Sequence, residues 1–198
     1  QEERGDEEFQ AAFHEIVPKE VDRINDLVNR FINYAKPSSA QPAVADAAAL
    51  VRECLYLTDP VARQSPIRFD TRLEAGLLIR VSEGQLKQVL INVIINGIEA
   101  MERRLKQEDS ARRLTMAIRA QGQGERAVIS VRDEGVGMTP EELERCRTPY
   151  FTTKPEGIGL GLCVSNDLVR LNGGTMTIES EPGAYTLIQI AFAREEVQ

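Results

Sequence analysis

Asp133 and two glycine-rich segments are the parts of this chain best suited to chemistry. Asp133 follows an alternating apolar run at 127–131 and precedes Gly135 and Gly137. We therefore expect its carboxylate at the mouth of a strand, where glycines let a flat ligand approach closely. The second segment, 157–162, holds three glycines directly before a helical pattern. Free backbone N–H groups and the positive end of a helix dipole meet at such a position, so the arrangement suits phosphate.

A row of polar side chains lies within a second, otherwise apolar helical pattern. Asn92, Asn96 and Glu99 are spaced four and three residues apart, which places them on one helix face. Amides and a carboxylate on a core helix are costly unless something polar meets them. A phosphate-bound Mg²⁺ would meet them, with Asn96 as the oxygen ligand and Asn92 and Glu99 holding water or phosphate. For any one of these residues, a solvated helix edge is the simpler alternative.

Elements at predictable places position these residues. The apolar patterns indicate helices at 47–61, at 82–105 and after 162, and strands at 67–73, 77–81, 114–120, 127–131, 175–179 and 185–192. Asp46 is placed to cap the first of these helices. Because strands and helices are segregated rather than alternating, we predict an α+β fold, a two-layer α/β sandwich with a mixed sheet and helices on one face.

The first part of the chain predicts a long helix. Apolar residues at 17–35 follow a heptad seam, and such a stripe needs a partner helix to cover it. No other segment of the sequence supplies that partner, so we expect a homodimer or a truncated helical hairpin. The segment 36–42, which holds two prolines and two serines, indicates a hinge or linker.

Composition limits the functional classes. The chain has 24 Lys and Arg and 31 Asp and Glu, a formal net charge of −7, which argues against general nucleic-acid binding. Cys54, Cys146 and Cys163 lack metal-ligand spacing, and Cys54 and Cys163 fit core thiols in a reducing compartment. There is no signal sequence and no apolar run long enough to span a bilayer. We expect a cytoplasmic chain; a membrane anchor, if the full-length protein has one, lies outside these residues.

Four segments in order resemble a known set of nucleotide motifs. Residues 92–100, 133–137, 149–154 and 157–162 resemble the N, G1, F and G2 boxes of sensor histidine kinases, which share an ATPase superfamily with DNA gyrase, Hsp90 and MutL. The resemblance covers about 46–193. Residues 17–37 resemble the second helix of the kinase dimerisation hairpin, which favours a histidine kinase of the nitrogen-regulatory type. It implies a partial dimerisation helix at 1–37, a linker at 38–45 and an ATP-binding catalytic domain at 46–198.

The resemblance implies roles for individual residues. Asp133 would accept a hydrogen bond from the adenine amino group, Asn96 would bind Mg²⁺, and Lys154 would reach the terminal phosphate from a mobile lid. Backbone N–H groups around Gly159 and Gly161 would hold the phosphates. The implied ATP-binding set is Asn92, Asn96, Glu99, Asp133, Gly135, Gly137, Thr153, Lys154, Gly157, Gly159, Leu160, Gly161 and Leu162, with Asn92, Asn96 and Lys154 catalytic.

The implied activity is transfer of the γ-phosphate of ATP, with Mg²⁺, to a histidine of a dimerisation domain for relay to a response regulator aspartate. Gyrase-like relatives carry a water-activating glutamate where this chain has Asn92, and its absence fits a kinase. Gly97 stands where alanine is usual, and 184–186 departs from the common Gly-Thr pair. Two alternatives stay open: a serine kinase of the anti-sigma-factor type, and a non-catalytic, nucleotide-dependent docking module.

His14, the only histidine, is a weak candidate for the phosphoacceptor. His14 and Glu15 match the start of the family's acceptor box, but Pro18 follows the histidine by four residues instead of five. His14 also precedes Tyr34 on what resembles the second helix, whereas the acceptor belongs on the first. We expect the true acceptor on a first helix that this sequence lacks, so that the chain phosphorylates a hairpin supplied in trans. The interpretation we favour for His14 is a packed or partly exposed helix histidine.

Overall fold

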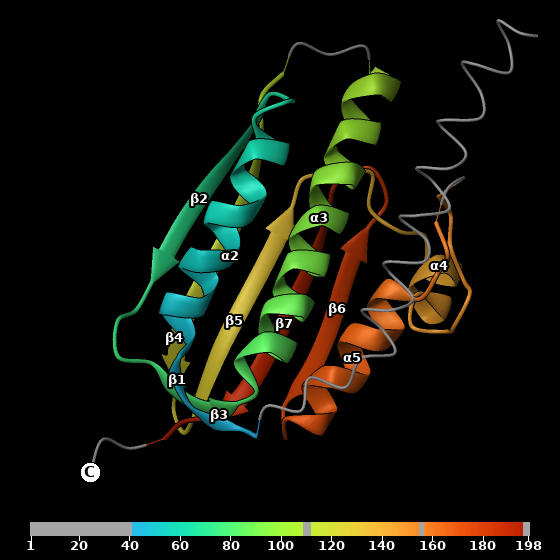
Figure 1. Cartoon of the computed structure of the whole chain (residues 1–198). Helices are drawn as coiled ribbons and strands as arrows, with labels where there is room; N and C mark the ends of the chain where they lie inside the picture. Colours follow the sequence, from blue (N-terminus) through green and yellow to red (C-terminus); the bar gives the residue numbers. More distant parts are fainter. Residues whose placement is uncertain (1–40, 109–111, 155–156, 196–198) are drawn as a thin grey trace, which may run out of the picture. The chain divides into compact units, whose positions relative to one another are not determined.

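Five strands form the sheet on which the described part of the chain is built (Figure 1). The structure, a computed structural model, describes residues 41–108, 112–154 and 157–195. The described residues contain these strands: β1 (Ala43–Asp46), β2 (Ile67–Leu73), β3 (Leu78–Val81), β4 (Leu114–Gln123), β5 (Arg126–Asp133), β6 (Thr175–Glu181) and β7 (Tyr185–Ala193). Strands β1 and β3 pair with each other outside the five-stranded sheet. The helices are α2 (Ala47–Ala62), α3 (Glu83–Glu108), α4 (Pro140–Arg145) and α5 (Gly161–Leu171).

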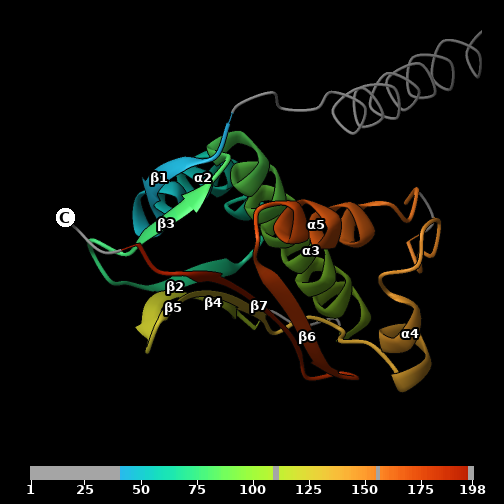
Figure 2. The same ribbon diagram turned by 90° about the horizontal axis from the view of Figure 1, so that it is seen from below.

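The sheet has the strand order β2-β4-β5-β7-β6. Strands β2 and β4 are parallel, and the other three pairs are antiparallel. Figure 2 shows α2, α3 and α5 together on one face of this sheet. The predicted α+β sandwich with a mixed sheet and helices on one face is therefore confirmed.

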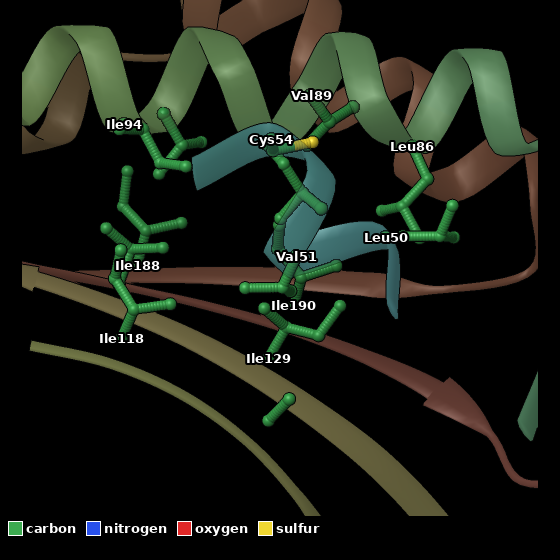
Figure 3. Packing of buried hydrophobic residues seen from close by; sticks show 14 of the residues in the cluster. Leu50, Val51, Cys54, Leu86, Val89, Ile94, Ile118, Ile129, Ile188 and Ile190 are labelled. Carbon is green, nitrogen blue, oxygen red and sulfur yellow. The ribbon is translucent and has the colours of Figure 1, made fainter. Parts of the chain in front are cut away.

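The core lies between that helical layer and the sheet (Figure 3). Alternate residues of β4 are buried, while those between them are partly or fully exposed, as expected for a sheet with one face covered. From α3, Leu86, Val89 and Ile94 point into the same layer and are almost fully buried. Helix α3 is thereby fixed against the sheet, and its polar face lies at the margin of the core.

The side chain of Asn172 connects α5 with α3. Asn172 follows α5, and its amide accepts from the Ser82 N–H (2.7 Å) and donates to Gln85 Oε1 (2.7 Å) at the start of α3. One amide therefore fixes the end of α5 to the start of α3.

Two elements differ from expectation. Residues 43–46 form β1, which pairs with β3, although the sequence predicted a linker through residue 45. The short helix α4 was missed, although Thr139 and Glu142 form a capping box with Pro140 at its start. The sequence carries that signature, but the helix is too short to show a periodic apolar face.

Other boundaries moved by a few residues. Helix α3 runs to Glu108 instead of about 105, and the turn between β4 and β5 falls at 124–125. Cys54 and Cys146 are buried, but Cys163 is only partly buried, so its assignment as a core thiol was wrong. The predicted helix at 17–35, the hinge up to residue 40 and His14 lie outside the described residues. Among the helices of 41–108, 112–154 and 157–195, none combines the length and hydropathy needed to cross a membrane.

Candidate active site

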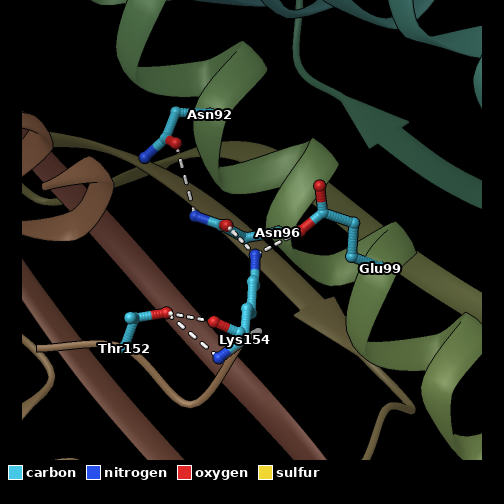
Figure 4. A network of polar contacts seen from close by, with 5 residues as sticks. All are labelled: Asn92, Asn96, Glu99, Thr152 and Lys154. Atoms are coloured by element: carbon cyan, nitrogen blue, oxygen red, sulfur yellow. Dashed lines mark hydrogen bonds and ion pairs between the residues drawn. The ribbon is translucent and has the colours of Figure 1, made fainter. Parts of the chain in front are cut away.

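Two residues of the predicted polar row on α3, Asn92 and Asn96, form a hydrogen-bonded line, and Glu99 is connected to it through Lys154 (Figure 4). Asn96 Nδ2 donates to Asn92 Oδ1 (3.4 Å), and Asn92 Nδ2 donates to Ser165 Oγ of α5 (2.8 Å). Ser165 is 2% exposed. Asn92 therefore uses both ends of its amide to connect α3 with α5, and it has no group that could act as a general base.

Lys154 reaches this line from the α4–α5 loop, of which the structure describes residues 146–154 and 157–160. Its Nζ donates to Asn96 Oδ1 (2.5 Å) and forms an ion pair with Glu99 Oε2. Its own N–H donates to Thr152 Oγ1 (3.0 Å), which closes a turn in the loop. The fold thus brings together Asn96, Glu99 and Lys154.

Asp133 is the last residue of β5 and is only 5% exposed. Burial raises the pKa of its carboxyl from 3.8 to about 6, while the N–H groups of Gly135 and Thr186 favour the charged form and limit the rise. The Gly135 N–H donates to Asp133 Oδ1 at 2.9 Å. Thr186 lies opposite Asp133 in the β5–β7 pair. A carboxylate withdrawn from water at a strand end is a strong acceptor for a ligand N–H.

Contacts with α3 and with the β6–β7 hairpin fix the backbone after Asp133. At Gly135 a Cβ would lie 2.6 Å from Ala100 Cβ, and at Gly137 it would lie 2.0 Å from Glu181 O. Arg104 Nη1 donates to the carbonyls of Glu134 (3.0 Å) and Ala184 (3.1 Å). This loop is therefore held between α3 and the β6–β7 hairpin, and Gly137 serves that packing.

Gly97 has a comparable packing role. A Cβ there would lie 2.6 Å from Met116 Cε and 3.2 Å from Asp133 Cβ. Glycine in a helix interior costs about 1 kcal/mol relative to alanine. At this position it makes room for the Met116 side chain and for Asp133, which explains the departure from alanine noted in the sequence.

Helix α5 begins without a side-chain cap. Leu160 occupies the N-cap position and makes no capping hydrogen bond, whereas Asp46 caps α2 and Thr139 caps α4. A Cβ at Gly161 would lie 2.7 Å from Asn92 Oδ1, so the bare glycine lets the helix start close to the α3 line. An uncapped helix N-terminus leaves backbone N–H groups for an anion.

The implied ATP-binding set also includes Thr153, Gly157, Gly159 and Leu162, which make none of the contacts described above. Thr153 is exposed, and it is Thr152 that shapes the turn at Lys154. Gly157 packs against Thr152, and Gly159 has φ +73° beside the backbone of Phe151. Leu162 is partly buried and packs on the core.

Three residues that shape the site were not assigned to it from the sequence, although Thr186 lies in the segment 184–186 noted above. Ser165, Thr186 and Arg104 contact Asn92, Asp133 and the loop after Asp133, respectively. Each contact joins segments far apart in the chain. Only the spacing of Ser165 after the glycine segment, on the helix expected to follow it, could have indicated one of them.

The raised pKa of Asp133 predicts a pH-dependent stability. Because its folded pKa of about 6 exceeds the ordinary 3.8, the folded state holds a proton that the unfolded state loses between these values. This stabilisation is complete below the unfolded pKa and is lost as pH rises through 6. Between pH 7.5 and 4.5, wild type should gain about 2 kcal/mol over Asp133→Asn. Urea unfolding of both proteins across this range measures the difference, and a pH-independent difference would contradict the assignment.

Comparisons with known proteins identify relatives of this chain. A family model described as histidine kinase-, DNA gyrase B-, and HSP90-like ATPase matches residues 81–196. The chain is 34% identical over 169 residues to sensor histidine kinase ZraS of Klebsiella oxytoca, covering 85% of this chain and 35% of ZraS. It is 30% identical over 186 residues to sensor protein DegM of a Bacillus species, covering 94% of this chain and 47% of DegM. The chain thus spans less than half the length of these relatives.

Solved structures show the same fold. The catalytic domain of histidine kinase ThkA superposes with a TM-score of 0.67 at 24% identity, covering 78% of this chain and 97% of that domain. ThkA in complex with response regulator protein TrrA gives a TM-score of 0.70 at 22% identity, covering 93% of this chain and 51% of that one. At these identities the likeness establishes the architecture of the sandwich.

Proposed function

Because the chain belongs to the family of histidine kinase-, DNA gyrase B- and HSP90-like ATPases, we propose that it is the ATP-binding catalytic module of a sensor histidine kinase. Its reaction would be transfer of the γ-phosphate of ATP to a histidine of a dimerisation hairpin, for relay to a response regulator. The names of ZraS, a sensor histidine kinase, and of the ThkA complex with a response regulator support this proposal.

The observation that carries the proposal is the bonding of Asn92. A hydrolase of this superfamily needs a base where Asn92 stands, but this amide donates to Ser165 and accepts from Asn96. It therefore fixes α5 to α3 and activates no water. Phosphoryl transfer to a neutral imidazole requires positioning and charge neutralisation more than a base on the ATP side, and the lysine and the helix N-terminus provide both.

The described residues fit Mg²⁺ held mainly by phosphates. They contain no group of three or more His, Cys, Asp or Glu that could hold a metal ion by themselves. Asn96 Oδ1 already accepts from a cationic group, Lys154 Nζ, so it is an oxygen placed for a cation. Mg²⁺ commonly takes one or two protein oxygens together with phosphates and water. When bound, it would neutralise phosphate charge, with Asn96 as its protein ligand.

Different groups of the chain would bind different parts of the ATP molecule. Asp133 would accept from the adenine amino group, which fixes the base at the end of β5. The N–H groups at the start of α5 would hold phosphates, and Lys154 would neutralise the terminal one. We propose that the adenine-binding end of the site is rigid, because Arg104 and the β6–β7 hairpin hold the loop that follows Asp133.

The finer parts of the proposal concern the whole protein. We propose the division into a partial dimerisation helix at 1–37, a linker at 38–45 and a catalytic domain at 46–198, a nitrogen-regulatory type of kinase and a homodimer. The acceptor would be a hairpin histidine other than His14. Because ATP is the proposed substrate, we expect the module to work in the cytoplasm.

Titration calorimetry with a non-hydrolysable ATP analogue, with and without Mg²⁺, tests the site. Incubation with γ-labelled ATP and a dimerisation hairpin containing a histidine then tests the transfer. We expect Mg²⁺-dependent binding and acid-labile, alkali-stable label on the hairpin. Label on this chain alone would make His14 the acceptor. Free phosphate without protein label would indicate a hydrolase, acid-stable label a serine kinase, and absence of binding a docking module.

A further inference from the structure

The lysine of the α4–α5 loop occupies the oxygen that the proposed site would offer to Mg²⁺. Lys154 Nζ donates to Asn96 Oδ1 at 2.5 Å and forms an ion pair with Glu99 Oε2. Figure 4 shows the lysine side chain extending from the loop to both residues of α3. These two contacts fasten the loop to the helix.

Glu99 is poorly suited to contact phosphate directly. A carboxylate and a triphosphate are both negative, and their repulsion grows where water is partly excluded. The side chains of Lys154 and Glu99 are 29% and 38% exposed, so both are partly withdrawn from solvent. In the structure the partner of Glu99 is the lysine ammonium. Its charge therefore acts on Lys154.

The position of Asn96 links the lysine to the metal. An amide oxygen can accept two hydrogen bonds, but two cations at one oxygen repel each other. Tight binding of a metal at Asn96 and of the ammonium at the same atom are therefore mutually exclusive. Whatever holds Lys154 on α3 competes with the metal.

We propose that Glu99 is a positioning residue that, together with Asn96, holds Lys154 on α3 until nucleotide binds, and that Lys154 leaves Asn96 Oδ1 when this oxygen is required as a ligand for Mg²⁺. The released ammonium then moves to the phosphates. No covalent bond changes in this exchange. The inference rests on the proposed function and adds to it the residue that ties the loop to α3.

Acetylation with acetic anhydride, without nucleotide, tests the tether. In Glu99→Gln the rate at Lys154, followed by mass spectrometry, should rise several-fold over wild type, because the ammonium loses its counter-ion. Glu53→Gln is the matched control. It breaks the ion pair between Glu53 and Lys87 (2.8 Å) and should raise the rate at Lys87 while leaving Lys154 unchanged. An unchanged Lys154 rate in Glu99→Gln would overturn the proposal.

A double-mutant cycle tests the exchange. Calorimetry with Mg²⁺ and the non-hydrolysable ATP analogue compares wild type, Glu99→Gln, Lys154→Met and the double variant. Glu99→Gln should raise affinity several-fold when Lys154 is present and much less when it is methionine, because no tether remains to be broken. An equal gain in both backgrounds would mean that Glu99 acts by its own charge on the phosphates, and a loss would mean that it supports the metal. Either result overturns the proposal.

The two experiments separate this inference from the proposed function. If wild type binds no nucleotide, the proposed function fails, whereas the acetylation result still reports whether Glu99 holds Lys154. If wild type binds and the cycle shows no coupling between Glu99 and Lys154, the proposed function stands and the exchange is wrong.

Discussion

Asp133→Asn should weaken binding of a non-hydrolysable ATP analogue by about a hundredfold, or about 3 kcal/mol. The carboxylate of Asp133 is 5% exposed, so water cannot replace the hydrogen bond that it would accept from the adenine amino group. An asparagine amide can turn its NH₂ toward that amino group and oppose one donor with another. Titration calorimetry at pH 7.5, where the wild-type carboxyl is ionised, measures the loss.

Base preference gives the sharper readout for the same variant. Inosine triphosphate carries a carbonyl where ATP carries the amino group, so wild type should prefer ATP and Asp133→Asn should lose that preference. Asp70→Asn is the matched control, because Asp70 is a carboxylate of β2 that pairs with Arg119 and belongs to no part of the site. Equal affinities of wild type and Asp133→Asn for ATP would refute the assignment of the adenine end.

Gly137→Ala should destabilise the domain by about 3 kcal/mol or more. Gly137 has φ +64°, and a Cβ would lie 2.0 Å from Glu181 O and 2.7 Å from Glu181 C. Both atoms belong to the backbone at the β6–β7 hairpin, which is also bonded to this loop through the Gly183 N–H and Val136 O (2.7 Å). Relief of the overlap would require the hairpin to separate from the loop. Urea denaturation measures the change in the free energy of unfolding.

Two other glycines serve as controls that separate the cost of backbone strain at positive φ from the cost of steric overlap. Gly124 and Gly183 have φ +60° and +71°, but a Cβ at either would meet nothing within 4 Å. Alanine there should cost only the left-handed backbone strain, about 1 kcal/mol. If Gly137→Ala costs no more than Gly124→Ala, then the contact with Glu181 is not what requires glycine. This loop directly follows Asp133, which is the proposed adenine-binding residue. Gly137→Ala should therefore also weaken nucleotide binding.

These contacts describe a site with two differently held ends. At the adenine end, Arg104 and the hairpin fix the backbone after Asp133. At the phosphate end, Lys154 is attached to α3 mainly through Asn96 and Glu99. A site that fixes the base through backbone packing and the phosphates through side chains can exchange the second set of contacts while retaining the first.

The sequence by itself determined the order of the elements and the residues of chemical interest. The helical phase of Asn92, Asn96 and Glu99, the strand end at Asp133 and the glycine-led start of α5 depend on neighbours within a few residues, and the structure confirmed all three. The fold class followed from the same local patterns, because apolar periodicity shows which face of each element is covered.

Only the tertiary structure decided what those residues contact. The pairing of Asp133 with Thr186, the overlap that Gly137 avoids at Glu181 and the attachment of Lys154 to Glu99 each join distant parts of the chain. Such contacts depend on how sheet register and helix packing close the domain, and a single sequence contains no local signal for them. For that reason the sequence predicted that Glu99 holds water or phosphate, whereas in the structure its carboxylate forms an ion pair with Lys154.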